Sequence, residues 1–420
     1  MAHWFHRNPL KATATVSFDF KGITADGKTH GICRKLKETR GQLLLLLSDP
    51  NNSTEAVKQA TDNYGALLHG VIVSPDQQNP GESKLRYGLQ FRWTNTLGGN
   101  KALDRHDAVF EQVSMLMNVA LWYTKHAAKL AGDEEPSMEQ AKEVHKCLRT
   151  AAGIYSYIKD SLLSSLTEEA PKGSDIDSRV LTAYLHQCTG EAQEVTIARA
   201  IELKHSTSII SSLAYETARM FQAADDSLAS LEDNASLKWR KYLQFKINIY
   251  TAYAYNYHGE TLLAQDKCGD AIGCLQESQK YYAKAAEAGK EYASVRGPGT
   301  TARPHEHLFF RKLGPIIKRT LEKCVRENGF IYHQKVPPVV PELELKATYG
   351  LAAPEEFTPP QCSPEWTVEA YTAFNITTKP LTAEESKKEK KEEKDLPPVK
   401  EEDVSGSKKD PSNSSGCVVS

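Results

Sequence analysis

The last four residues, Cys417, Val418, Val419 and Ser420, are the clearest chemical signal in the sequence. A cysteine followed by two aliphatic residues and a terminal serine directs prenylation of the cysteine, and serine at the end favours farnesyl. The polar run SNSSG before Cys417 would leave the thiol accessible to the transferase. We therefore expect a covalent farnesyl group on Cys417 and no other cofactor. The alternative is a chance match in a polar tail.

A single lipid gives only marginal, reversible membrane binding, so stable anchoring needs a second contact. Residues 381–416 carry eight Lys against ten Asp and Glu and no second cysteine, so they supply neither a basic patch nor another lipid site. A membrane-bound partner would have to provide that contact. The predicted location is the cytoplasmic face of a membrane, with the lipid as a peripheral anchor.

Other chemistry is poorly supported by the residue patterns. The 13 His and eight Cys form no His-Glu-x-x-His and no C-x-x-C pair, so we predict no metal site. Cys188 with His186 or His205 could suggest a cysteine hydrolase, but residues two apart on a helix point to different sides. Cys188 also lies in an apolar run and is expected to be a buried, inert thiol. We predict no catalytic residues.

The composition is that of an ordinary globular chain, with 420 residues, 40% hydrophobic and 25% charged. The formal charge of −2 provides no overall field that would attract nucleic acid or anionic lipid. The N-terminal stretch lacks the pattern of a secretory signal, and the apolar run Leu43–Leu47 is far too short to span a bilayer. The cysteines are accordingly expected to be reduced.

The apolar spacing predicts a mainly helical chain. Residues 10–24 alternate apolar and polar types and predict one or two short strands. From about Cys33 the spacing becomes helical, and short loops imply antiparallel neighbours. Thr207 or Ser208 is the expected N-cap of one helix. The long predicted helices cover 104–131, 138–165, 176–203, 207–231, 235–265 and 268–292.

The C-terminal part divides into two further segments. After Pro337 the chain is proline-rich but keeps apolar residues, among them Tyr349, Leu351 and Trp366, and we expect this strap to pack on the body. Residues 376–416 are charged and lack the apolar surface needed for ordering, so we predict a solvated, disordered linker. The predicted divisions are 1–375, 376–416 and 417–420.

Several motifs together resemble the Bro1 domain family. They are ENGFIYHQKVP at 327–337, EAQEV at 191–195, SKLRYGLQFRWTNTL at 83–97 and AAGIYSYIKD at 151–160. With the prenylation box, the chain resembles prenylated members of that family over essentially its full length. The resemblance implies an elongated, boomerang-shaped helical solenoid with tetratricopeptide-like hairpins and a small N-terminal β-sheet.

The resemblance also implies a partner and a site. Bro1 domains of the Alix type bind amphipathic C-terminal helices of ESCRT-III subunits, the charged multivesicular body proteins, in a hydrophobic groove. Its central residues fall on Ile209 and Leu213. An aromatic position of the groove falls on Thr196, and a lysine position on Lys142, whose acidic neighbour is replaced by Met138. Without the resemblance, an apolar pair four residues apart on a helix more often faces the core.

We therefore expect a non-enzymatic, monomeric adaptor in ESCRT-dependent membrane budding, remodelling or repair, at the endosome or nuclear envelope, without affinity for nucleic acid. Two alternatives remain: a lipid-anchored scaffold for other peptides, and a lipid-anchored enzyme. An enzyme would place a strongly perturbed acid or base in a closed pocket. An adaptor would show an open apolar groove, and Leu213→Asp would abolish binding while leaving the fold intact.

Overall fold

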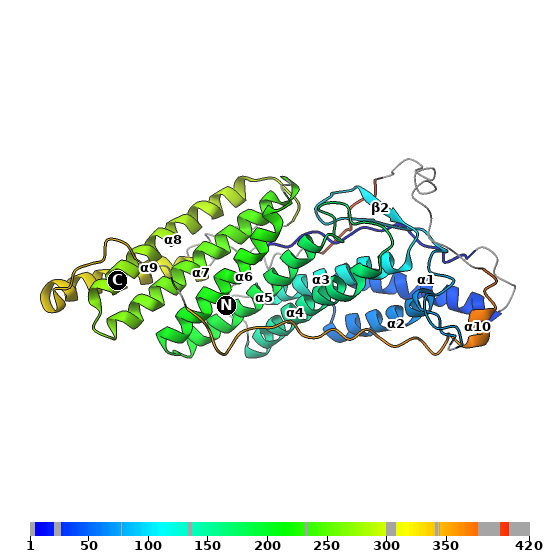
Figure 1. Cartoon of the computed structure of the whole chain (residues 1–420), viewed down its shortest axis with the longest axis horizontal. Coiled ribbons are helices and arrows are strands. Elements are labelled where there is room, and N and C mark those ends of the chain that lie inside the picture. The colour runs from blue at the N-terminus through cyan, green and yellow to red at the C-terminus, as the bar shows by residue number, and fades with distance from the viewer. Residues whose placement is uncertain are drawn as a thin grey trace, which may run out of the picture.

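The computed structural model describes residues 5–20, 27–76, 78–132, 137–231, 234–299, 308–340, 343, 345–376 and 395–402. The predicted prenylation box at 417–420 lies outside the described residues. The molecule is elongated, with its long helices stacked side by side (Figure 1). Among the described helices, none combines the length and the apolar character needed to cross a bilayer.

The helices form a solenoid in which each long helix packs mainly on its neighbours in sequence. All six long helices predicted from the spacing are present, with ends within a few residues of the prediction. Two π-helical turns, Ile158–Leu162 and Asn328–Tyr332, extend α4 and α9. The helices are α1 (Gly27–Leu47), α2 (Thr54–Ile72), α3 (Ala108–Ala131), α4 (Met138–Tyr157), α5 (Ser178–Glu202), α6 (Thr207–Ala229), α7 (Leu237–Leu263), α8 (Cys268–Ser294), α9 (Leu308–Glu327) and α10 (Val368–Thr372).

Polar side chains set several helix starts. The Asp107 carboxylate accepts the Val109 amide at the start of α3, and Ser137 forms a capping box with Gln140 at the start of α4. The predicted N-cap of α6 was wrong. Ser206 occupies that position, because its carbonyl accepts the first helical amides, and its hydroxyl makes no capping bond.

The strands predicted at residues 10–24 are not found over residues 10–20, and residues 21–24 lie outside the described residues. The small sheet consists of β1 (Phe91–Thr94) and β2 (Ala102–Arg105), antiparallel, with Phe91 opposite Arg105. The N-terminal segment contributes a single bridge from Thr13 to Trp93. Phe18 has φ +58°, which interrupts the extended run, and its side chain packs in the core instead.

The strap packs back on the body as predicted. It follows one long edge of the molecule, orange in Figure 1, and ends with Trp366 and Phe374 in the core. Along α4 its Glu355 amide donates to the Arg149 carbonyl at 3.0 Å. The approach requires glycine at 153, because a Cβ there would collide with the Glu355 backbone.

The prediction of a solvated linker over 376–416 does not hold for residues 395–402. The Leu396 amide donates to the Asn100 carbonyl at 3.0 Å, and the Glu402 amide donates to the Ser48 carbonyl at 3.2 Å. Val399 packs against the core. Average composition disfavours independent folding, but it does not prevent a short segment with a few apolar residues from binding a preformed surface.

Candidate functional site

A cavity of about 440 Å³ opens where the start of α4, the end of α5 and the start of α6 meet. We call it the α4–α6 cavity. Tyr349 and Gly350 of the strap lie at its edge. A smaller hollow of about 120 Å³ adjoins it, and both share Ile209, Leu213 and Tyr349. The two hollows therefore follow the first two turns of α6, and Tyr349 lines both.

All four groove residues predicted from the family resemblance line this cavity: Lys142, Thr196, Ile209 and Leu213. Their exposures differ. Leu213 is 3% exposed and lies close to the strap, whereas Ile209 is half-buried. The expectation that Leu213→Asp would leave the fold intact therefore does not suit this structure, because the new carboxylate would be buried without a partner. Ile209 is the better position for a test.

Tyr349 is the main residue of the cavity that the sequence did not reveal. We expected the strap residues Tyr349 and Leu351 to pack on the body, but they are 62% and 44% exposed. Gly350 turns the strap there with φ +76°, a conformation that favours glycine. The dipeptide Tyr349-Gly350 was the sequence feature that could have indicated this exposure, since a turn at a glycine can direct the preceding side chain outward.

The cavity has an apolar floor and a charged rim. Val195, Ile209 and Leu213 supply apolar surface. Lys142 and Arg199 lie at the rim, and the acidic lining residue Glu202 pairs with Arg199 at 2.8 Å. Such a surface suits an amphipathic helix with an apolar face and acidic flanks.

The EAQEV stretch connects the cavity to the strap. Gln193 is buried, and its amide nitrogen donates to the Gly350 carbonyl at 2.9 Å while its oxygen accepts the Ala352 amide at 2.6 Å. Val195, two residues further along α5, lines the cavity. Gln193 thus fixes the strap segment that carries Tyr349.

The opposite side of the same stretch enters a buried group of charges. Glu191 forms an ion pair with Arg7 at 2.8 Å, and Glu194 forms one with Lys246 at 2.7 Å. Burial raises the pKa of Glu194 to about 7, and the Lys246 charge opposes that rise. Glu194 is thus the perturbed acid that an enzyme would need. It lines neither of the two hollows described above, and its partner is a structural cation.

The candidate hydrolase cysteine is also buried. Cys188 is 1% exposed, as predicted, and burial, assisted by the Glu191 charge, raises the pKa of its thiol. The thiolate is therefore disfavoured, and neither a substrate nor a proton acceptor from solvent can reach the sulfur.

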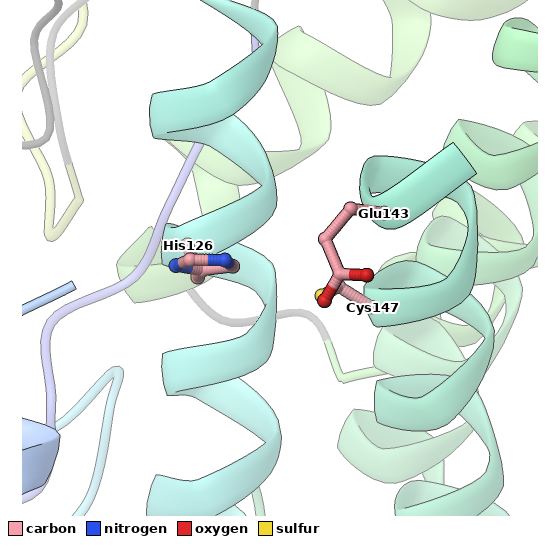
Figure 2. A group of neighbouring side chains, drawn as sticks. All are labelled: His126, Glu143 and Cys147. Carbon is pink, nitrogen blue, oxygen red and sulfur yellow. The ribbon is translucent and has the colours of Figure 1, made fainter. Parts of the chain in front are cut away.

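Three ligand-type side chains meet between α3 and α4. Figure 2 shows Glu143 and Cys147 on one helix with His126 on its neighbour, and their ligand atoms lie within 4.8 Å of one another. The Cys147 thiol donates to Glu143 at 3.6 Å, and Glu143 also accepts the Thr54 hydroxyl at 3.0 Å. Burial and the Glu143 charge raise the pKa of Cys147, which favours the thiol. We assign no metal to this cluster.

A family model and curated proteins both relate this chain to BRO1 domain proteins. Residues 33–386 match the model of the BRO1-like domain. The BRO1 domain-containing protein BROX of Homo sapiens is 55% identical over 380 residues, which cover 90% of this chain and 92% of that protein. The Danio rerio protein of the same name is 50% identical over 419 residues, covering 100% of both chains.

Solved structures agree with the family match. The ALIX BRO1 domain in complex with CHMP4C has a TM-score of 0.66 at 21% identity, covering 86% of this chain and 98% of that one. A Bro1 domain described as the basis for endosomal targeting has a TM-score of 0.63 at 18% identity, covering 89% and 96%. These similarities confirm the predicted fold class, which is mainly helical with a small sheet.

Proposed function

Because the chain belongs to the BRO1-like domain family, we propose that it is a non-enzymatic adaptor that binds an amphipathic C-terminal helix of an ESCRT-III subunit in the α4–α6 cavity. The solved ALIX complex with CHMP4C, a charged multivesicular body protein, supports this class of partner. The adaptor would act in ESCRT-dependent budding, remodelling or repair at an endosomal or nuclear-envelope membrane.

One observation supports the proposal most strongly. The four positions that the family resemblance assigns to the groove come from three helices, yet they line a single cavity. Ile209 and Tyr349 offer apolar surface that a helix could cover, and Lys142 lies where acidic side chains of that helix would reach. An apolar ridge with flanking charges is the usual pattern of helix-in-groove recognition.

The proposal is tested by titrating the full chain with labelled C-terminal peptides of ESCRT-III subunits. Ile209→Asp would place a carboxylate in the apolar floor and should weaken binding at least about tenfold, as loss of a central contact does. Leu45→Asp is the matched control, because Leu45 is 73% exposed on α1 and lines neither hollow. It should bind like the wild type.

If Ile209→Asp bound as tightly as the wild type, the cavity would not be the ESCRT-III site. Absence of binding by the folded wild type would contradict the ESCRT-III proposal and favour the scaffold for other peptides.

We propose in addition that Cys417 carries a farnesyl group that tethers the protein to a cytoplasmic membrane face. The sequence pattern supports this proposal. Mass spectrometry of protein from eukaryotic cells should show the mass of a farnesyl group on Cys417, and Cys417→Ser should lose both the adduct and membrane recovery. An unmodified cysteine in the wild type would contradict it.

A further inference from the structure

Residues 395–402, which we call the tail segment, contact parts of the body that are far apart in sequence. We propose that the tail segment is a ligand of its own body, held by a carboxylate site on Lys125 and the Leu10 amide, and that its docking sets the length of the tether to Cys417. The tether part rests on the lipid proposed for Cys417.

The carboxylate site is formed by one buried cation and one backbone amide. Glu401 places one oxygen 2.6 Å from the Lys125 ammonium, and its other oxygen accepts the Leu10 amide at 2.7 Å. The Lys125 side chain is 4% exposed, on α3 beneath the N-terminal segment. Both Glu401 oxygens are thus satisfied by groups that the folded body holds in place.

Lys125 needs this partner for an electrostatic reason. Burial lowers its pKa, the nearby Arg7 charge acts in the same direction, and Glu401 opposes both. Among the described residues, Glu401 is the carboxylate that forms an ion pair with Lys125. Departure of Glu401 would remove the carboxylate partner of Lys125, and the ammonium would then have to be hydrated or deprotonated. The body therefore favours the docked state.

Further contacts fix the direction of the tail segment. The Leu396 amide bonds to Asn100 in the loop between β1 and β2, and the Glu402 amide bonds to Ser48 just after α1. Val399 packs against the core between them. The body therefore holds the tail segment at both ends, at its apolar residue and at one carboxylate. This set of contacts is specific to the segment.

Docking shortens the stretch of sequence between the last body contact and Cys417. From Ile376 the tether would contain 41 residues, the difference between 417 and 376, but from Glu402 it contains 15, the difference between 417 and 402. At about 3.5 Å per extended residue these lengths reach about 140 Å and about 50 Å. In Figure 1 the tail segment lies near β2 at the upper edge, whereas the strap follows the lower edge. Docking would therefore hold the body close to the membrane and start the tether away from the strap.

Hydrogen exchange on full-length protein made in bacteria, which carries no prenyl group, tests docking independently of the lipid. Glu401→Gln should increase exchange of the Leu396 and Glu402 amides, which donate to the body, at least tenfold. Glu402→Gln is the matched control, since Glu402 is exposed and its side chain reaches Asn51 at 3.5 Å; it should change the rates less than twofold. The proposed docking would be wrong if these amides exchanged without protection in the wild type, or if their exchange rates were equal in the two variants.

Lys125→Met provides the reciprocal change, because it removes the cation while keeping apolar bulk. It should release the tail segment as Glu401→Gln does, with urea unfolding confirming that the body remains folded. Retained protection in this folded variant would show that Lys125 does not hold the segment, and would overturn the carboxylate site.

Farnesylated protein on vesicles tests the tether. Energy transfer from the body tryptophans to an acceptor at the bilayer surface should fall in Glu401→Gln and stay at the wild-type value in Glu402→Gln. Equal transfer in both would contradict the tether role. The vesicles carry a tethered ESCRT-III C-terminal peptide, because a single lipid needs a second contact for stable binding. If no farnesylated form bound these vesicles, the proposed lipid anchor and its tether would fail together, while the exchange result would still test the docking of the tail segment.

Discussion

The two sides of the EAQEV stretch of α5 can be compared directly. On one side, Glu191 and Glu194 are fully buried in ion pairs with Arg7 and Lys246. On the other side, Thr196 and its neighbours line an open cavity. The side with the buried carboxylates is closed to any partner, whereas the side that lines the cavity is accessible.

This difference explains why a perturbed pKa does not locate the site in this protein. Burial, which raises the pKa of Glu194, also removes it from substrates and partners. The cavity that we propose for recognition instead combines accessible apolar side chains with charged residues such as Lys142. The buried charges serve to connect α5 to the N-terminal segment and α7.

The largest effect is expected from Glu191→Gln, which removes the charge that neutralises buried Arg7. Breaking one partner of a buried pair costs about 3–5 kcal/mol, so urea should unfold this variant at a much lower concentration. Glu202→Gln on the same helix breaks an exposed pair with Arg199 and should cost less than about 1 kcal/mol. Similar losses of unfolding free energy in both variants would contradict the view that the ion pairs on the buried side of α5 contribute more to stability than the exposed one.

Gln193→Ala should have the next largest effect, because it removes both hydrogen bonds that fix the strap. Leaving buried polar groups unpaired costs about 1–3 kcal/mol. We expect that loss in urea unfolding, together with faster hydrogen exchange of the Ala352 amide, which donates to Gln193. An unchanged Ala352 rate would show that other contacts hold the strap.

The pH dependence of stability tests the burial of His6, which precedes Arg7 in the sequence. Burial lowers the pKa of His6 to about 3, below its ordinary value of 6.5, so the unfolded chain binds a proton that the native protein excludes. Stability from this group is present above pH 6.5 and falls by about 1.4 kcal/mol per pH unit below it. Glu194, whose pKa is raised, opposes this trend, since its contribution is lost as the pH rises through about 7.

The contribution of His6 is obtained from the difference between the wild type and His6→Gln. Urea unfolding at pH 6.5 and 5.5 should show a smaller loss on acidification in the variant. Parallel slopes for the two proteins would mean that His6 binds a proton as readily in the folded protein as in the unfolded chain, so that burial does not lower its pKa.

The smallest effect concerns the rim of the cavity. Lys142→Ala should weaken binding of an acidic amphipathic helix about two- to fivefold at low salt, because rim charges mainly assist association. The difference from the wild type should vanish at high salt, where surface charges are screened. Titrations at two salt concentrations measure both effects, and a salt-independent loss would mean that Lys142 makes a buried contact.

Much of the fold was predictable because it depends on local patterns. The six long helices follow from apolar spacing and short loops. The caps Asp107 and Ser137, which set two of the helix starts, were not identified from the sequence. The strands were misplaced because the alternation over residues 10–20, the described part of that stretch, reflects single side chains entering the core, beside the left-handed Phe18. Periodicity alone cannot separate that arrangement from a strand.

For the candidate site, only the residues that the family motifs could place were predicted from the sequence. The family resemblance placed Ile209 and Thr196 in one groove, and the structure brings them together. Tyr349 and the docked Glu401 could not be found in this way, because they reach α5 and α3 from segments distant in sequence. Their positions depend on tertiary contacts, such as the strap hydrogen bonds of Gln193, that leave no local periodic signal.

The most direct test of the central claim is a hydrogen-exchange footprint of the full chain with a bound ESCRT-III C-terminal peptide. We predict slower exchange at the end of α5 and the start of α6, residues 195–213, and at strap residues 348–351, with no change in the buried part of α5 around Glu191. Protection elsewhere, for example around Cys147 between α3 and α4, with none at 195–213 would contradict the account.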